Sequence, residues 1–204
     1  LFIEFMAPLQ YFLFFCAIGS IIIGTFGALY QKKIKRLLAY SGISHVGFIL
    51  LGIACGTIEG LQSSLFYWIS YVVMSLILFI ILISCRDKIN FTKIRYISDL
   101  NLLAKVNPFL TLIFVLIIFS MAGIPPLIGF FSKFYVLLSL INLSLFSLAI
   151  ITVLISAVGC FYYLRLIKII YFDNKIKFKL YNKISYGNSI ILGFLIFIIT
   201  LFVV

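Results

Sequence analysis

The sequence predicts an all-α membrane protein, a polytopic bundle of about six transmembrane helices of which one is discontinuous. Three observations predict this class. Hydrophobic residues make up 65% of the 204 residues, charged residues make up only 10%, and the apolar residues run together in long segments. A soluble domain carries roughly a quarter of its residues as charged groups. This chain has too few to cover itself in water, so lipid is the expected solvent for most of it.

The apolar segments are long enough to cross a hydrocarbon core roughly 30 Å thick. We read residues 1–204 as a single transmembrane domain, with spans at about residues 9–30, 37–56, 61–84, 107–141, 143–171 and 185–204. The fourth segment is too long for one straight crossing, and Gly123, Pro125 and Pro126 interrupt it. Because proline removes an amide donor and clashes with the preceding turn, we expect two half-helices broken near residues 123–126.

The basic residues predict an orientation. Fifteen of the 16 fall within residues 32–36, 86–105 and 165–183, which follow the first, third and fifth spans. The opposite side carries Glu4, Glu59 and a neutral turn at Asn142. Basic loops stay on the cytoplasmic or matrix side of a membrane, so both chain ends are expected on the other side. The net charge of +11 therefore reflects loop anchoring, and nucleic-acid binding is excluded as its cause.

The cysteines do not form a recognisable site. Each stands alone in or beside an apolar segment, without CxxC or Cys/His spacing, so the pattern predicts neither a metal site nor a disulfide framework. They are Cys16, Cys55, Cys85 and Cys160. No catalytic, cofactor-binding or metal-binding residue is predicted.

Lys133 is the exception among the basic residues. It precedes Asn142 by nine residues, which places it roughly 13 Å inside the membrane. An ionisable side chain at such depth costs about 2.5–3.5 kcal/mol, so it needs water, a carboxylate partner or a neutral amine. Snorkelling to an interface is the alternative, at the limit of a four-carbon side chain. We expect Lys133 to transfer protons, because Pro125 and Pro126 open the helix beside it and discontinuous helices recur at ion sites.

His45 is the single histidine, and it follows Arg36 by nine residues. This count starts from the basic side and also gives a depth of roughly 13 Å. Histidine exchanges protons near physiological pH, so a hydrated proton path is one interpretation, and hydrogen bonding between helices is the other. Polar side chains at helical spacing would share either role: Ser41, Ser44, Tyr67 and Tyr71.

Two motifs carry a family resemblance. Residues 33–48, KIKRLLAYSGISHVGF, resemble the tenth-helix motif of the antiporter-like subunits of respiratory complex I. Residues 121–135, MAGIPPLIGFFSKFY, resemble their broken twelfth helix, whose lysine is regarded as a proton-transfer residue. Within this family the sequence is most similar to the subunit 2 group, and the resemblance covers nearly the whole chain as the last six helices.

The resemblance implies a fold, a role and partners. The chain would be the second of two inverted helix repeats, with Lys133 as the second-half proton lysine and His45 as the central-axis histidine. It would hold no cofactor of its own, and NADH, FMN, iron–sulfur clusters and ubiquinone would bind elsewhere in the complex. Its partners would be lipids, other membrane-arm subunits and neighbouring antiporter-like subunits. Its location would be the mitochondrial inner membrane or, alternatively, a bacterial cytoplasmic membrane, with the basic loops on the matrix side.

The family's first repeat does not occur in this sequence, whose first residue is Leu. Three explanations stay open: a separate chain supplies that half, the sequence is part of a longer chain, or the chain is a scaffold that no longer pumps. Two other functions also fit the motifs, namely a subunit of a multi-subunit cation/proton antiporter and a structural bundle that supports its neighbours.

Overall fold

The computed structural model describes the backbone of residues 2–84, 95–101, 103–172 and 193, and the side chains of this set except those of residues 2–7 and 106. The helices in these ranges are α1 (Phe2–Leu29), α2 (Ile34–Ala54), α3 (Ile58–Ser84), η1 (Ile97–Leu100), α4 (Leu103–Val106), α5 (Pro108–Ala122), α6 (Ile128–Asn142) and α7 (Phe146–Phe172). The prediction of an all-α bundle with one discontinuous helix is confirmed.

Four helices in this part of the chain are long and apolar enough to cross a membrane: Pro8–Leu29 within α1, and the whole of α2, α3 and α7. Their ends differ from the predicted spans by at most three residues. The differences at the starts of α2 and α3 have one cause, because polar residues such as Lys35 and Glu59 continue the helix beyond its apolar run. The sixth predicted span, about residues 185–204, lies outside the described residues apart from residue 193.

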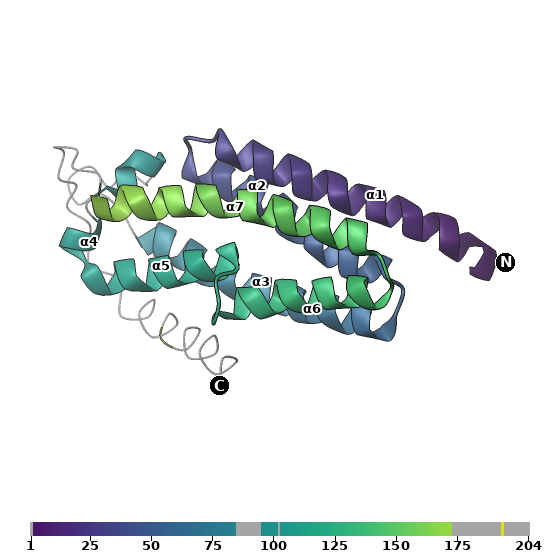
Figure 1. Ribbon diagram of the computed structural model, residues 1–204. Helices are drawn as coiled ribbons and strands as arrows, with labels where there is room; N and C mark the ends of the chain where they lie inside the picture. The colour runs from purple at the N-terminus through teal and green to yellow at the C-terminus, as the bar shows by residue number, and fades with distance from the viewer. Residues whose placement is uncertain (1, 85–94, 102, 173–192, 194–204) are drawn as a thin grey trace.

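The long helices pack side by side, with α2 between α1 and α3, and α7 against both α1 and α5 (Figure 1). Small residues allow the closest approach. A Cβ added at Gly24 of α1 would lie 2.5 Å from the backbone nitrogen of Ser44 on α2, and one at Gly47 would lie 2.9 Å from the carbonyl oxygen of Ala17. Glycines at helix contacts bring backbones together where lipid offers no hydrophobic drive for association.

The interrupted helix consists of α5 and α6, which lie end to end along the bundle (Figure 1). Asn107 begins α5, since its side chain accepts a bond from the Leu110 amide at 3.2 Å and Pro108 occupies the first turn. Gly123 ends α5 in the left-handed conformation, with φ 89°. The break extends one residue beyond the predicted 123–126, because Leu127 is still extended, with ψ 156°, where it precedes α6.

The described basic residues other than Lys133 gather at one end of the bundle. The backbones of Lys33 and Tyr96 pair in an isolated antiparallel β-bridge. The Arg165 guanidinium donates to the Leu29 carbonyl at 3.2 Å. These contacts join the α1–α2 turn, the segment that precedes η1 and the last turns of α7. At the other end, the Asn142 amide donates to the Glu59 carboxylate at 2.7 Å. The fold therefore places these basic residues and Glu59 at opposite ends of the bundle, as the sequence predicts.

Gly129 gives a test of how tightly the two half-helices meet. A Cβ at Gly129 would overlap the Ser120 backbone carbonyl. We expect Gly129→Ala to force α5 and α6 apart and to lower the thermal stability of the assembled protein by about 1–3 kcal/mol in free energy of unfolding.

Gly19 on α1 is the matched control, because a Cβ there meets nothing within 4 Å. Both variants are compared by thermal unfolding of the purified membrane complex that contains this chain. Equal stability of Gly129→Ala and Gly19→Ala would contradict the packing described here.

Candidate functional site

Lys133 lies in the second turn of α6, and its side chain reaches back to the end of α5. Side chains on a helix point toward its N-terminus, which here is the break. The Lys133 Nζ donates to the Ala122 carbonyl oxygen at 2.8 Å. The lysine therefore bridges the two half-helices at the point where the backbone is interrupted.

Pro126 explains why the Ala122 carbonyl is free to accept this bond. In a continuous helix, the carbonyl of residue 122 would accept from the amide of residue 126, and Pro126 has no amide hydrogen. The last carbonyls of a helix also carry the negative end of its dipole. The lysine amine thus supplies the donor that proline removes, and α5 presents partial negative charge to it.

The immediate surroundings of the Lys133 amine contain no carboxylate among the described residues. Besides the Ala122 carbonyl, the amine lies 5.7 Å from the centroid of the Phe48 ring, within the range of a cation–π interaction. Cys160 of α7 also directs its thiol to the Ala122 carbonyl, at 3.5 Å. Gly123 leaves room for the lysine, because a Cβ there would lie 3.0 Å from Nζ.

His45 of α2 is 3% exposed and bonded through both ring nitrogens. Its Nδ1 lies 2.8 Å from the Tyr67 hydroxyl, and its Nε2 lies 3.0 Å from the Tyr163 hydroxyl. Tyr71 stacks on the ring, with centroids 5.0 Å apart. A neutral imidazole donates through one nitrogen and accepts through the other, whereas a tyrosine hydroxyl can do either. The row of hydrogen bonds Tyr67–His45–Tyr163 can therefore exist with His45 donating to Tyr67 and accepting from Tyr163, or the reverse.

A small cavity lies between the two ionisable groups. Its volume is about 10 Å³, and both His45 and Lys133 line it together with Ser44, Phe48 and Tyr162. This volume is at the lower limit of the space that one water molecule needs. Met121, a further lining residue, also borders a second cavity of about 20 Å³ on the side of Tyr71.

The structure brings most of the sequence-predicted residues into one site. Tyr67 and Tyr71 of α3 contact His45 directly, and Ser44 lines the cavity. Ser41 is fully buried and donates to the Leu38 carbonyl of its own helix at 2.8 Å. Ser44 likewise donates to the Ser41 carbonyl at 2.7 Å. These hydroxyls keep lone pairs with which they can accept bonds from the tyrosines.

Tyr162 and Tyr163 of α7 belong to the site although the sequence reading did not select them. Their rings lie 4.3 Å apart, both are 2% exposed, and they interact with the side chains of Ser44 and Ser41 respectively. Tyrosines close to a basic loop are common at membrane interfaces. The sequence alone therefore does not separate these tyrosines from interfacial ones, and the bond from Tyr163 to His45 joins residues 118 positions apart.

Gly42 is another residue that the sequence reading passed over. A Cβ there would lie 2.8 Å from the Tyr71 hydroxyl, so glycine makes room for the ring that stacks on His45. Within the described ranges, no group of three His, Cys, Asp or Glu side chains is placed to hold a metal ion.

The chain resembles proteins of one family. The family described as "NADH:quinone oxidoreductase/Mrp antiporter, TM" matches residues 1–159. NADH-ubiquinone oxidoreductase chain 2 of Arabidopsis thaliana is 45% identical over 196 residues, which are 96% of this chain and 38% of the relative. NADH-quinone oxidoreductase subunit N of Parvibaculum lavamentivorans is 45% identical over 164 residues, which are 80% of this chain and 34% of the relative. The chain thus spans less than two fifths of the length of these relatives.

Solved structures give the same relationship. A chain of respiratory complex I from Thermus thermophilus superposes with a TM-score of 0.79 at 27% identity, covering 95% of this chain and 40% of that one. A chain of the Mrp complex from Dietzia sp. shares the fold, with a TM-score of 0.72 at 24% identity over 81% of this chain and 30% of that one. Together with the family match over residues 1–159, these similarities show that the chain belongs to the transmembrane family of NADH:quinone oxidoreductase and Mrp antiporter subunits.

Proposed function

We propose that this chain is a proton-translocating membrane-arm subunit of respiratory complex I and supplies the second half-channel of an antiporter-like subunit. One observation carries the proposal. The Lys133 amine is bonded to a backbone carbonyl at a helix break and borders, with His45, a cavity of the size of one water molecule. Such an arrangement can hold a proton inside a membrane and pass it on.

In the proposed mechanism, protonated Lys133 is stabilised by the Ala122 carbonyl and the Phe48 ring. Release of its proton to a water in the cavity leaves a neutral amine that can still donate to the carbonyl. The water would pass the proton toward the His45 site, and His45 would exchange it with Tyr67 or Tyr163 along existing hydrogen bonds. Each transfer moves a proton along one hydrogen bond, and rotation of a tyrosine hydroxyl then restores the chain for the next proton.

The chemistry proposed for this chain is proton transfer alone. NADH, FMN, iron–sulfur clusters and ubiquinone would react on other subunits, and this chain would use the energy released there. Its proposed location is the mitochondrial inner membrane, or the cytoplasmic membrane of a bacterium, with the basic end of the bundle on the matrix or cytoplasmic side. The gathering of Lys33, Arg95 and Arg165 at one end supports this orientation.

We further propose that a companion polypeptide supplies the first repeat of the antiporter-like fold, since a continuous polar axis needs both repeats. Chemical cross-linking of the native complex, followed by mass spectrometry, tests this. A partner chain with an acidic and several lysine residues in its apolar segments would support it. Peptides that join both halves in one polypeptide would contradict it.

A cation/proton antiporter subunit is the alternative that the family match admits. The two functions can be distinguished by proton flux in reconstituted vesicles. A complex I subunit moves protons when NADH is oxidised, whereas an antiporter subunit moves them against a sodium or potassium gradient without NADH. Sodium-dependent proton flux in the absence of NADH would therefore reject the complex I assignment.

Removal of the amine should strongly slow proton transfer through this half-channel. We expect Lys133→Gln to slow NADH-driven proton translocation by about two orders of magnitude at this site, the usual contribution of a positioned acid or base. Fewer protons would be moved per NADH oxidised by the assembled complex, which is measured with a pH-sensitive dye in vesicles.

Lys168→Gln on α7 is the matched control, because this lysine is exposed at the basic end of the bundle. It should leave the proton yield unchanged. If Lys133→Gln assembles and gives the same proton yield per NADH as Lys168→Gln, the chain has a supporting role only.

The tyrosines that bond to His45 should affect both stability and transfer. Tyr163→Phe leaves His45 Nε2 without its partner in a buried site, which costs about 1–3 kcal/mol. We expect a lower thermal stability of the complex, together with slower proton translocation and a changed kinetic solvent isotope effect. Measurements of translocation in H₂O and D₂O test the second part.

Tyr171→Phe is a suitable control on the same helix, since Tyr171 is 46% exposed. A merely structural role of Tyr163 predicts lower stability with an unaltered isotope effect, and that result would remove Tyr163 from the proton path.

A further inference from the structure

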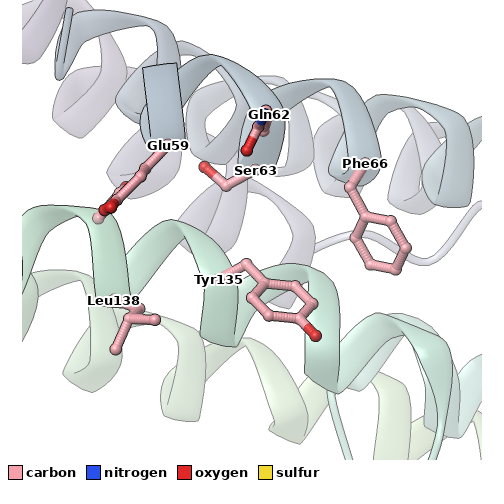
Figure 2. A pocket seen from close by; sticks show the side chains of 7 residues that line it. Glu59, Gln62, Ser63, Phe66, Tyr135 and Leu138 are labelled. Atoms are coloured by element: carbon pink, nitrogen blue, oxygen red, sulfur yellow. The ribbon is translucent and has the colours of Figure 1, made fainter. Parts of the chain in front are cut away.

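A second site lies away from the proton path, in a groove between the first half of α3 and the second half of α6. The groove has a volume of about 320 Å³ and opens on the outer face of the bundle. Figure 2 shows its lining residues, which include Glu59, Gln62, Ser63 and Phe66 from α3, with Tyr135 and Leu138 from α6. It begins at the end of the bundle opposite the basic residues.

Each polar side chain of the groove offers a hydrogen-bond acceptor, and the Gln62 amide also offers N–H donors. Glu59 Oε2 accepts from the Asn142 amide at 2.7 Å, and its other carboxylate oxygen carries no bond to the part of the chain described here. Ser63 donates to the Gly60 carbonyl at 2.8 Å, so its lone pairs remain free to accept. The Gln62 side chain is exposed and adds an amide oxygen. Carboxylate, amide and hydroxyl oxygens within one turn of helix suit a group with several N–H donors.

The apolar part of the groove lies deeper along the helices. Phe66 and Tyr135 meet edge to face, with ring centroids 5.6 Å apart, and form the far wall. Leu138 is 41% exposed and Tyr135 is 44% exposed on the side of α6. From Glu59 to Phe66 the groove runs seven residues, roughly 10 Å along α3. An occupant must therefore be polar at the rim and apolar about 10 Å farther in.

The negative charge of Glu59 at the rim limits which ligands the groove can bind. Glu59 is the charged side chain that the described residues place at this end of the bundle, while the described lysines and arginines other than Lys133 lie at the opposite end. A carboxylate at the rim attracts a cationic group and repels an anionic lipid headgroup. The groove covers only about a third of a membrane roughly 30 Å thick, so its length fits a lipid headgroup with the upper part of an acyl chain better than a crossing helix.

We propose that this groove binds a phospholipid with a primary amine headgroup, such as phosphatidylethanolamine. The ammonium donates to Glu59, Gln62 and Ser63, and an acyl chain lies against Leu138, Tyr135 and Phe66. The site is independent of proton transfer, since none of its residues touches His45 or Lys133 among the contacts described above. A lipid in this position would fill the gap between α3 and α6 and hold the second half-helix against its neighbour.

The test uses the intact complex that contains this chain, reconstituted in vesicles with a photoactivatable phosphatidylethanolamine. Labelled peptides are identified by mass spectrometry. We expect label within residues 59–66 and 135–142, and we expect unlabelled phosphatidylethanolamine to compete about tenfold better than phosphatidylcholine, whose headgroup donates no hydrogen bond. Glu59→Gln should remove this preference, and Leu138→Trp should abolish labelling by filling the apolar part.

Leu154→Trp on α7 is the matched control, because Leu154 is 62% exposed on another face, and it should leave the labelling of the groove unchanged. Three results would overturn the proposal: equal competition by the two lipids, labelling that survives Leu138→Trp, or cross-links from the groove to a neighbouring protein subunit in place of lipid. Proton translocation is measured on the same variants, and its retention in Leu138→Trp would show that the groove and the proton path are separate.

Discussion

The bond between the Lys133 amine and the Ala122 carbonyl is the interaction on which the site depends. A backbone carbonyl without a donor and a lysine without a counterion are each unfavourable in an apolar bundle. Pro126 leaves the Ala122 carbonyl without a donor because proline has no amide hydrogen. Lys133, one turn and a half into the next half-helix, donates to this carbonyl, and the carbonyl in turn stabilises the amine. The bond persists whether the amine is charged or neutral, so it can retain the side chain while its proton changes.

The histidine site follows a different principle. His45 is enclosed by aromatic rings and bonded only to hydroxyls, so no hydrogen bond to a charged group among the described residues decides which ring nitrogen carries the proton. Three helices contribute to it, α2 with the imidazole, α3 with Tyr67 and α7 with Tyr163. Because α7 meets α2 here through the Tyr163–His45 bond, a shift of α7 relative to α2 would alter that bond.

The two ends of the bundle differ in their charges and in their contacts. Backbone and side-chain bonds tie the α1–α2 turn, the segment before η1 and the end of α7 together at the basic end. At the opposite end, the pair of Asn142 and Glu59 joins α6 to α3, and the groove between these two helices is open. The charge that anchors the chain and the charge that faces the groove thus have opposite signs and lie at opposite ends.

The sequence by itself determined the fold class and the broken helix, and it singled out Lys133 and His45 as ionisable groups within apolar segments. Hydropathy, proline positions and isolated polar groups are local signals. The starts of α2 and α3 and the length of the break differ from the prediction, since a polar first turn and an extended Leu127 depend on neighbouring structure. Only the tertiary structure decided the partners. It placed the Ala122 carbonyl against the Lys133 amine, for which the sequence left water, a carboxylate or a neutral amine open, and it brought Tyr163 to His45 across 118 positions of sequence. Such contacts depend on how helices pack and on the direction of each side chain, and no local pattern encodes them.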